Sequence, residues 1–237
     1  MLRQTDASKF EWFGKGKGYA ALHAYIDDVT GWVVGAWFTK NESTAGYVAA
    51  LSIGLERYGL PMEIYSDRHT IFRSPQKSSE EEGEERSLSN FGQGLKDFGI
   101  GQIFALTPKA KGRIERLWNT LQDRLTGDPR LLGIKDIDGA NPLRGLRKVL
   151  PKLIAKHNEK FAVLPAEQET AYVKPVERID VDFLCARRQT RKTDGGGSFS
   201  YGGRTYVPTT PEKRSFRKNA HPISELGETK ATFSLNT

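Results

Sequence analysis

The sequence predicts an α/β protein followed by a small all-β domain. Through residue 125 the apolar pattern alternates between strand and helix spacing, in the order three strands, helix, strand, helix, strand, helix. Residues 182–207 contain short β-prone segments around two glycine clusters, which is typical of a small barrel. A length of 237 residues suffices for one sizeable core and a satellite domain.

Three successive antiparallel strands are expected at the start of the chain. Residues 1–13 are apolar enough for a strand that holds Asp6 near its middle, and residues 19–26 and 32–38 are β-prone. The segment from Asp28 to Gly31 has the composition of a hairpin turn between the second and third strands.

Helices and strands alternate in the next part of the chain. Residues 43–58 have helical apolar spacing, with Ser43 as the expected N-cap. The elements expected after it are a strand over 62–65 that leads to Asp67, a helix over 91–98 and a strand over 100–106. Between them, residues 74–87 form an acidic low-complexity insertion that we expect to be mobile.

Residues 109–125 are expected to form an amphipathic helix. Thr107 is the expected cap ahead of it, and Pro108 fits the first helical position. Five apolar residues recur at helical spacing along one side: Ile114, Leu117, Trp118, Leu121 and Leu125. Beside this stripe, at spacings of four, four and three, stand Lys111, Glu115, Asn119 and Gln122. The helix therefore presents Glu115 among bases and amides at the edge of the core.

The chain is expected to contain two domains. After Gly127 the pattern indicates an amphipathic basic helix over residues 143–157 and then a proline-bearing linker. The expected division is a core domain over 1–165, a linker over 166–180, a small barrel over 181–210 and a disordered tail over 211–237.

The charge distribution favours a polyanionic partner. The formal net charge is +7, and residues 183–218 carry nine bases against two acids. The cations expected to contact a nucleic-acid backbone are Lys109, Lys111, Arg113, Arg116, Arg187, Arg188, Arg191, Lys192 and Arg204. The sequence has no bilayer-spanning apolar run and no targeting segment, and its one cysteine, Cys185, fits a reducing compartment. We therefore expect a cytoplasmic, nucleoid-associated protein.

Three carboxylates could meet at one edge of the expected sheet. Asp6 lies on the first strand, Asp67 at the end of the fourth, and Glu115 on the helix after the fifth. If the first and fourth strands are neighbours, the three acids come together, and divalent cations must offset their mutual repulsion. Oxygen ligands of this kind suit Mg²⁺ or Mn²⁺, and two such ions could support in-line phosphoryl transfer.

Four ordered motifs carry a family resemblance: Gln4–Ser8, Ile26–Gly31, Tyr65–His69 and Lys111–Arg116 followed by Asn119 and Leu121. With these motifs, residues 1–165 resemble the catalytic core of DDE transposases and retroviral-type integrases, and most of all the transposases of bacterial insertion sequences. Residues 183–206 resemble the C-terminal SH3-like DNA-binding barrel of these proteins. The resemblance implies an RNase H-like core, which is a mixed five-stranded sheet flanked by helices, with Asp6, Asp67 and Glu115 as the metal-binding residues.

The sequence departs from the family pattern in two respects. Between Asp67 and Glu115 lie 47 residues, at positions 68–114, which is more than in the family's shortest members, and the acidic insertion accounts for the excess. Transposases of this kind carry helix-turn-helix domains ahead of the core, whereas Asp6 comes almost at the start of this sequence. We therefore expect a fragment or a truncated reading frame.

Several site candidates have alternatives. Asp27 and Asp28 are rivals to Asp6 as the first metal ligand, although a hairpin turn is the ordinary place for such residues. His69 and Asn119 are auxiliary candidates, and His69 either contacts DNA phosphate, orients a water or is a hydrogen-bonded loop residue. The residues expected to belong to the core instead of a site are His23, Trp12 and Trp118.

The expected function is that of a DNA transposase or integrase. Water and then a DNA 3′-hydroxyl would attack a phosphodiester held at two Mg²⁺ or Mn²⁺ ions. The alternatives are an RNase H-like nuclease, and a truncated DNA-binding protein that is not catalytic and inhibits transposition. The expected partners are double-stranded DNA, as transposon ends and target, and further copies of the chain on that DNA.

Overall fold

The computed structural model describes residues 2–67, 70–77, 86–105, 112–126, 128, 133–134, 137, 139–141, 149–163, 184, 187–192, 198–201, 203–206 and 230–235. The chain divides into two compact units, Met1–Cys185 and Ala186–Thr237. Within the described part of the chain, every helix is too short or too polar to cross a lipid bilayer.

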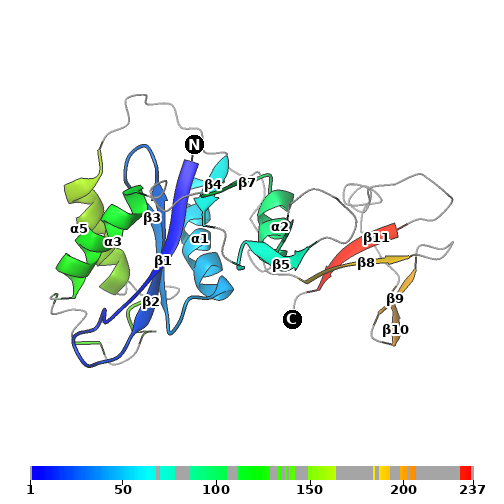
Figure 1. Cartoon of the computed structure of the whole chain (residues 1–237), viewed down its shortest axis with the longest axis horizontal. Coiled ribbons are helices and arrows are strands. Elements are labelled where there is room, and N and C mark those ends of the chain that lie inside the picture. The colour runs from blue at the N-terminus through cyan, green and yellow to red at the C-terminus, as the bar shows by residue number, and fades with distance from the viewer. Residues whose placement is uncertain are drawn as a thin grey trace. The chain divides into compact units, whose positions relative to one another are not determined.

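The first unit is built on a mixed five-stranded sheet (Figure 1). Its strands are β1 (Leu2–Phe10), β2 (Ala20–Asp27), β3 (Val33–Thr39), β4 (Glu63–Ser66) and β7 (Gly101–Phe104), in the spatial order β3-β2-β1-β4-β7. The pairs β1–β2 and β2–β3 are antiparallel, whereas β1–β4 and β4–β7 are parallel. This order fits an RNase H-like core, and it makes the first and fourth strands neighbours as the carboxylate site requires.

Helices cover both faces of this sheet. They are α1 (Thr44–Tyr58), α2 (Asn90–Asp97), α3 (Gly112–Leu125) and α5 (Val149–Phe161). Figure 1 shows α3 and α5 on one side of the sheet and α1 on the other. Ser43 caps α1 as expected, because its hydroxyl accepts a hydrogen bond from the Gly46 amide at 3.2 Å. The expected caps of α3, Thr107 and Pro108, lie outside the described residues.

Side chains along β2 point alternately to the two faces of the sheet, so the core has two layers. Leu22 and Ala24 belong to the layer with α3 and α5, whereas Tyr25 packs with α1, and every residue of β2 is buried. Gly35 on β3 lets the backbones of β3 and α1 touch, because a Cβ there would overlap the carbonyl oxygen of Ala50. The sheet is therefore a rigid platform for side chains that project from β1.

Two asparagines cover the outer edge of β3. Asn158 on α5 accepts from the Val33 amide at 2.9 Å and donates to the Val33 carbonyl at 3.0 Å. Asn141 does the same for Phe38, with distances of 2.8 and 2.9 Å. Both amides thus satisfy backbone groups that an edge strand would otherwise offer to another strand.

Strands are present in parts of two segments expected to be irregular. The segment over residues 74–87, expected to be a mobile insertion, starts and ends in the antiparallel strands β5 (Arg73–Lys77) and β6 (Arg86–Leu88). Residues 211–237, expected to be a disordered tail, contain strand β11 (Lys230–Leu235). The acidic residues between Lys77 and Arg86 and most of the tail lie outside the described residues, so the expectation for them stays a prediction.

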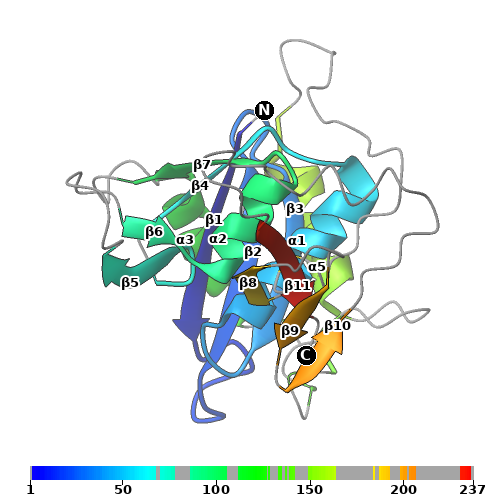
Figure 2. The same cartoon turned by 90° about the vertical axis from the view of Figure 1, so that its right-hand side faces the viewer.

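The described residues of the second unit form two small antiparallel sheets (Figure 2). Strand β8 (Arg187–Lys192) pairs with β11, and β9 (Phe199–Tyr201) pairs with β10 (Arg204–Tyr206). Gly203, at the turn between β9 and β10, has a φ of 74°, which favours glycine. The unit is all-β in its described residues, as the sequence predicts.

Candidate catalytic site

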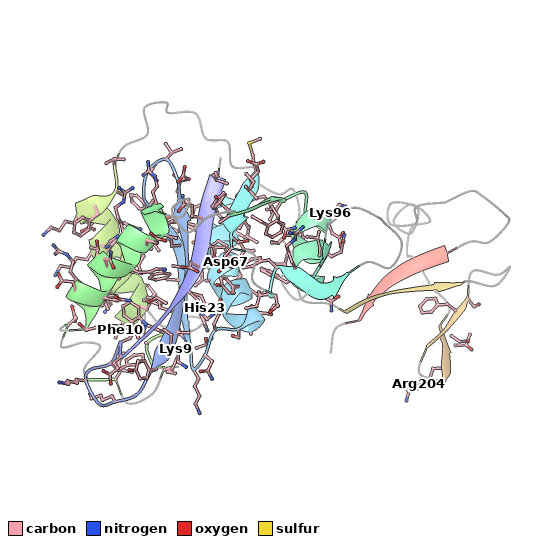
Figure 3. The ribbon with its side chains drawn as sticks, in the orientation of Figure 1. Lys9, Phe10, His23, Asp67, Lys96 and Arg204 are labelled. Atoms are coloured by element: carbon pink, nitrogen blue, oxygen red, sulfur yellow. The ribbon has the colours of Figure 1, made fainter. Side chains whose placement is uncertain are left out.

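Asp6 is on β1, and Asp67 directly follows β4, the parallel neighbour of β1. Leu2 on β1 is in register with Glu63 on β4, an offset of 61 residues, and the same offset relates Asp6 to Asp67, which directly follows β4. Strands in a sheet are about 4.8 Å apart. Both carboxylates are half-buried, and their placement in one site stays a prediction; Figure 3 labels Asp67.

The pleat of β1 directs Asp6 towards α3. Gln4 and Asp6 both contact residues of α3, whereas buried Arg3 donates to the carbonyls of Gly54 and Gly59 at the end of α1. Asp6 therefore faces the α3 side of the sheet.

Three hydrogen bonds join α3 to β1, from residues four apart on the helix and two apart on the strand. They are Ile114 N to Gln4 Oε1 at 3.3 Å, Trp118 Nε1 to Asp6 Oδ2 at 3.1 Å, and Gln122 Nε2 to Ser8 Oγ at 2.9 Å. Four helical residues and two strand residues both advance by about 6 Å. The helix therefore lies along β1 in a fixed register.

Glu115 is exposed in the first turn of α3, between Ile114 and Trp118. Both of these neighbours are hydrogen-bonded to β1, so α3 is held beside the Asp6 strand at this point. Among the residues that the structure describes, no three His, Cys, Asp or Glu side chains are close enough to hold a metal ion together. The joint placement of Asp6, Asp67 and Glu115 in one metal site therefore stays a prediction.

Tyr47 on α1 is a buried phenol within range of the charges of both aspartates, which the sequence did not indicate. Its hydroxyl donates to Glu42 Oε1 at 2.7 Å. Burial raises the pKa of Tyr47 far above its ordinary value, and the negative charges of Glu42, Asp6 and Asp67 raise it further. The phenol therefore stays neutral. Its position on an apolar helix face is typical of a core residue and gave no signal of this role.

The two rival aspartates have structural partners. Asp27 Oδ1 accepts from the amides of Val29 and Thr30 and from the Thr30 hydroxyl, at 2.8 to 3.1 Å, which is the predicted turn role. Asp28 Oδ1 accepts from Gln4 Nε2 at 2.7 Å and lies 3.4 Å from Arg113 Nε. These contacts explain both residues without a metal.

The structure tests the predictions for His23, Trp12 and Trp118, but not the prediction for His69. His23 is a core residue as predicted: it accepts from the Ser43 amide at 3.2 Å, packs edge-on against Tyr47, and burial lowers its pKa to about 4. Trp12 and Trp118 pack in the core as predicted, and the bond from Trp118 to Asp6 is additional. His69 lies outside the described residues.

The cations predicted to bind nucleic acid lie in both units. Arg113 is half-exposed on α3, and Arg116 and Asn119 are exposed there, whereas Lys109 and Lys111 lie outside the described residues. Four of the basic residues fall on β8: Arg187, Arg188, Arg191 and Lys192. Arg204 is exposed at the start of β10, and Figure 3 labels it. Contact of these residues with a nucleic acid stays a prediction.

The sequence is similar to bacterial transposases. The protein "Putative transposase y4bF" of Sinorhizobium fredii is 34% identical over 192 residues, which are 79% of this chain and 40% of that protein. The transposase for insertion sequence IS1202 of Streptococcus pneumoniae is 33% identical over 218 residues, 91% of this chain and 44% of that protein. The chain thus spans less than half the length of either relative. No protein-family model matches the sequence.

Solved retroviral integrase structures show a weaker likeness. The HTLV-2 integrase catalytic core domain in complex with magnesium has a TM-score of 0.35 and 20% identity, covering 55% of this chain and 81% of that chain. A simian T-cell lymphotropic virus intasome in complex with a PP2A regulatory subunit has a TM-score of 0.40 and 17% identity, covering 97% and 75%. Both TM-scores are below 0.5, so the fold is defined by the strand order and not by these structures.

Proposed function

We propose that this chain, a relative of bacterial transposases, contains a transposase catalytic domain that cuts and joins DNA. The observation that carries the proposal is the sequence identity of 33 to 34% to transposases over most of the chain. Because the chain spans less than half of either relative, the proposal concerns the chemistry of the matched part.

The proposed catalytic residues are Asp6, Asp67 and Glu115. The position of Asp67 directly after β4, the parallel neighbour of β1, supports the first two. The three hydrogen bonds that hold α3 along β1 support the third, since Glu115 lies between two of the bonded helix residues. An all-carboxylate donor set fits Mg²⁺ or Mn²⁺, and we propose that the three residues hold two such ions.

Bound divalent cations would make an attacking oxygen more acidic and offset negative charge on the phosphodiester. The residues of the chain supply orientation: Trp118 holds one oxygen of Asp6, and the neutral phenol of Tyr47 adds no negative charge beside the two aspartates. In the first step a water oxygen bonds to phosphorus and the P–O3′ bond breaks, which leaves a 3′-hydroxyl. In the second step this 3′-hydroxyl attacks a target phosphodiester, whose own 3′-oxygen leaves and takes up a proton.

The basic residues are the proposed DNA contacts. On α3, Arg113 and Arg116 flank Glu115 in sequence, and Lys109 and Lys111 precede it. In the second unit, β8 carries four bases and β10 carries Arg204, and we propose that this unit is an SH3-like barrel that binds the DNA backbone. Binding of transposon ends and target by several copies of the chain is part of the same proposal.

A strand-transfer assay tests this function. The full chain is incubated with Mg²⁺ or Mn²⁺, a plasmid target, and labelled pre-cleaved DNA ends taken from the sequence that flanks the reading frame. Three proteins are compared: the parent, Asp67→Asn, and Asp123→Asn as a control for an exposed acid elsewhere on α3. Joined products are expected from the parent and the control. We expect at least a hundredfold loss in Asp67→Asn, on the order of what a lost catalytic carboxylate costs.

The other outcomes identify the alternatives. Cleavage without any joined product indicates a nuclease. DNA binding without cleavage, unchanged in Asp67→Asn, indicates a non-catalytic DNA-binding protein. Either result would overturn the proposed strand-transfer function.

A further inference from the structure

A pocket of about 280 Å³ lies between α3 and α5, in the first unit. It is lined, among others, by Ile26, Arg113, Arg116, Leu117, His157 and Phe161. At about 100° per residue, Arg116 and Leu117 are rotated roughly 100° and 200° around α3 from Glu115. The pocket therefore uses a different face of α3 from the proposed catalytic residue.

The floor and the rim of the pocket differ in chemistry. Ile26 and Leu117 are buried core residues and give an apolar floor. Arg116 is exposed at the rim, and Arg113, which is ion-paired with Asp28, lies beside it. An apolar floor with a cationic rim fits a ligand that combines a flat apolar ring with an anionic group.

His157 lines this pocket with a largely buried imidazole ring. The residue is only 8% exposed, and its Nδ1 is buried and has no hydrogen-bond partner within the described part of the chain. Burial lowers the pKa of His157, and the charge of Arg124 lowers it further, so the ring is neutral and carries one donor and one acceptor nitrogen. The neutral imidazole therefore adds a flat aromatic surface to the pocket lining, next to the ring of Phe161.

Phe161 gives the pocket an accessible aromatic ring. It is 39% exposed, and its ring lies 5.0 Å from that of His157, centroid to centroid. Two cations stand over it: Arg124 Cζ at 4.7 Å and Lys160 Nζ at 5.8 Å from the ring centroid. Aromatic rings next to cations are the common means of binding unpaired bases and their phosphates.

We propose that this pocket binds one unpaired nucleotide of DNA, with its base on the apolar floor beside Phe161 and its phosphate at Arg116 and Arg113. The apolar floor favours a base over a phosphate alone, and the rim favours a nucleotide over an uncharged ring. The inference rests on the proposed function, which supplies DNA as the ligand. It adds a single-strand contact separate from the carboxylates.

The test compares two DNAs of equal length by fluorescence anisotropy with the full chain. One is a blunt duplex, and the other ends in a single-stranded overhang. The variants are Phe161→Ala and Arg116→Gln, with Arg57→Gln as the control for an exposed arginine on α1. Phe161→Ala should weaken binding of the overhang DNA about tenfold and leave the blunt duplex unchanged. Arg116→Gln should weaken the overhang DNA and reduce its salt dependence, and Arg57→Gln should change neither.

The remaining outcomes show whether the pocket inference alone is wrong or the proposed function is wrong as well. If Phe161→Ala weakens both DNAs equally or neither, the pocket inference is wrong, while joining activity that is lost in Asp67→Asn keeps the proposed function. If the parent binds neither DNA, both the proposed function and the pocket inference are wrong. Because a lower melting temperature of Phe161→Ala could lower affinity indirectly, Phe161→Leu is measured as well. It keeps the apolar bulk and should show the same selective loss for the overhang DNA.

Discussion

The indole Nε1 of Trp118 donates to Oδ2 of Asp6 at 3.1 Å and so connects the middle of α3 to the middle of β1. A neutral donor thereby fixes the direction of a carboxylate on β1, the parallel neighbour of the strand that Asp67 directly follows. Trp118 also packs edge-on against Trp12 in the core, so the donor itself is held rigidly. The hydrophobic core and the candidate site therefore share Trp118, so a change at this residue should affect both.

Replacing Trp118 with Phe should therefore affect stability and chemistry together. The variant keeps an aromatic ring in the core and loses the hydrogen bond to Asp6, which should cost about 1 to 2 kcal/mol of unfolding free energy. Joining activity should fall roughly tenfold, because the Asp6 carboxylate is less well oriented. Trp12→Phe is the matched control, since Trp12 Nε1 donates to the Ser8 carbonyl at 3.0 Å and not to a carboxylate. Urea denaturation and strand transfer are measured on both, and equal activity losses would contradict the role of the Asp6 contact.

The proposed metal site predicts that the melting temperature of Asp67→Asn, relative to that of the parent, depends on divalent cations. In the presence of a chelator, Asp67→Asn removes one of the like charges of the proposed site and should melt roughly 2 to 4 °C above the parent. Added Mg²⁺ should raise the melting temperature of the parent by binding to the folded state and have little effect on the variant. Asp123→Asn, an exposed acid of α3, should follow the parent in both conditions. Equal Mg²⁺ shifts in the parent and Asp67→Asn would argue against a metal site at Asp67.

Local patterns predicted most of the first unit but not its long-range contacts. The cap at Ser43 and the strand ahead of Asp67 follow from residue types and spacing that lie within a few positions. The hydrogen bond from Trp118 to Asp6 joins residues that are 112 positions apart. Helical periodicity predicts which side of α3 is buried, but it does not predict which polar atom of another element that side contacts. The same holds for Asn158, which pairs with Val33 across 125 positions.

Composition did not indicate the strands that lie beside or within two segments expected to be irregular. The acidic residues between Lys77 and Arg86 suggested an unstructured segment, yet the flanking residues pair as β5 and β6. Likewise, Phe233 and its neighbours have no long-range signal of their own and are ordered by pairing with β8. The partner of β11 is distant in sequence, and a single sequence does not identify it, whereas β5 and β6 are close together in the chain.

Gly35 should be intolerant of any side chain. A Cβ at this position would overlap the carbonyl of Ala50, so α1 would have to move away from β3. Overpacking of this kind should cost about 3 kcal/mol in Gly35→Ala. Gly112→Ala is the control, because a Cβ there meets no atom within 4 Å and alanine favours the helix by roughly 0.5 kcal/mol. Chemical denaturation of the two variants should show opposite signs, and a stable Gly35→Ala would mean that the helix and the strand are not in backbone contact.

The buried histidine of β2 predicts how the protein responds to acid. Burial lowers the pKa of His23 from 6.5 to about 4, so below pH 6.5 the unfolded chain binds a proton that the folded chain does not. Stability should therefore fall as the pH drops from 6.5 to 4, with a His23 contribution of about 3 kcal/mol at the lower end, and it should be unaffected by His23 above 6.5. Unfolding free energies of the parent and His23→Gln are measured across this range. The variant should be less stable at neutral pH, because the ring accepts from the Ser43 amide, and should lose less stability on acidification. Parallel curves for the two proteins would show that His23 does not resist protonation in the fold.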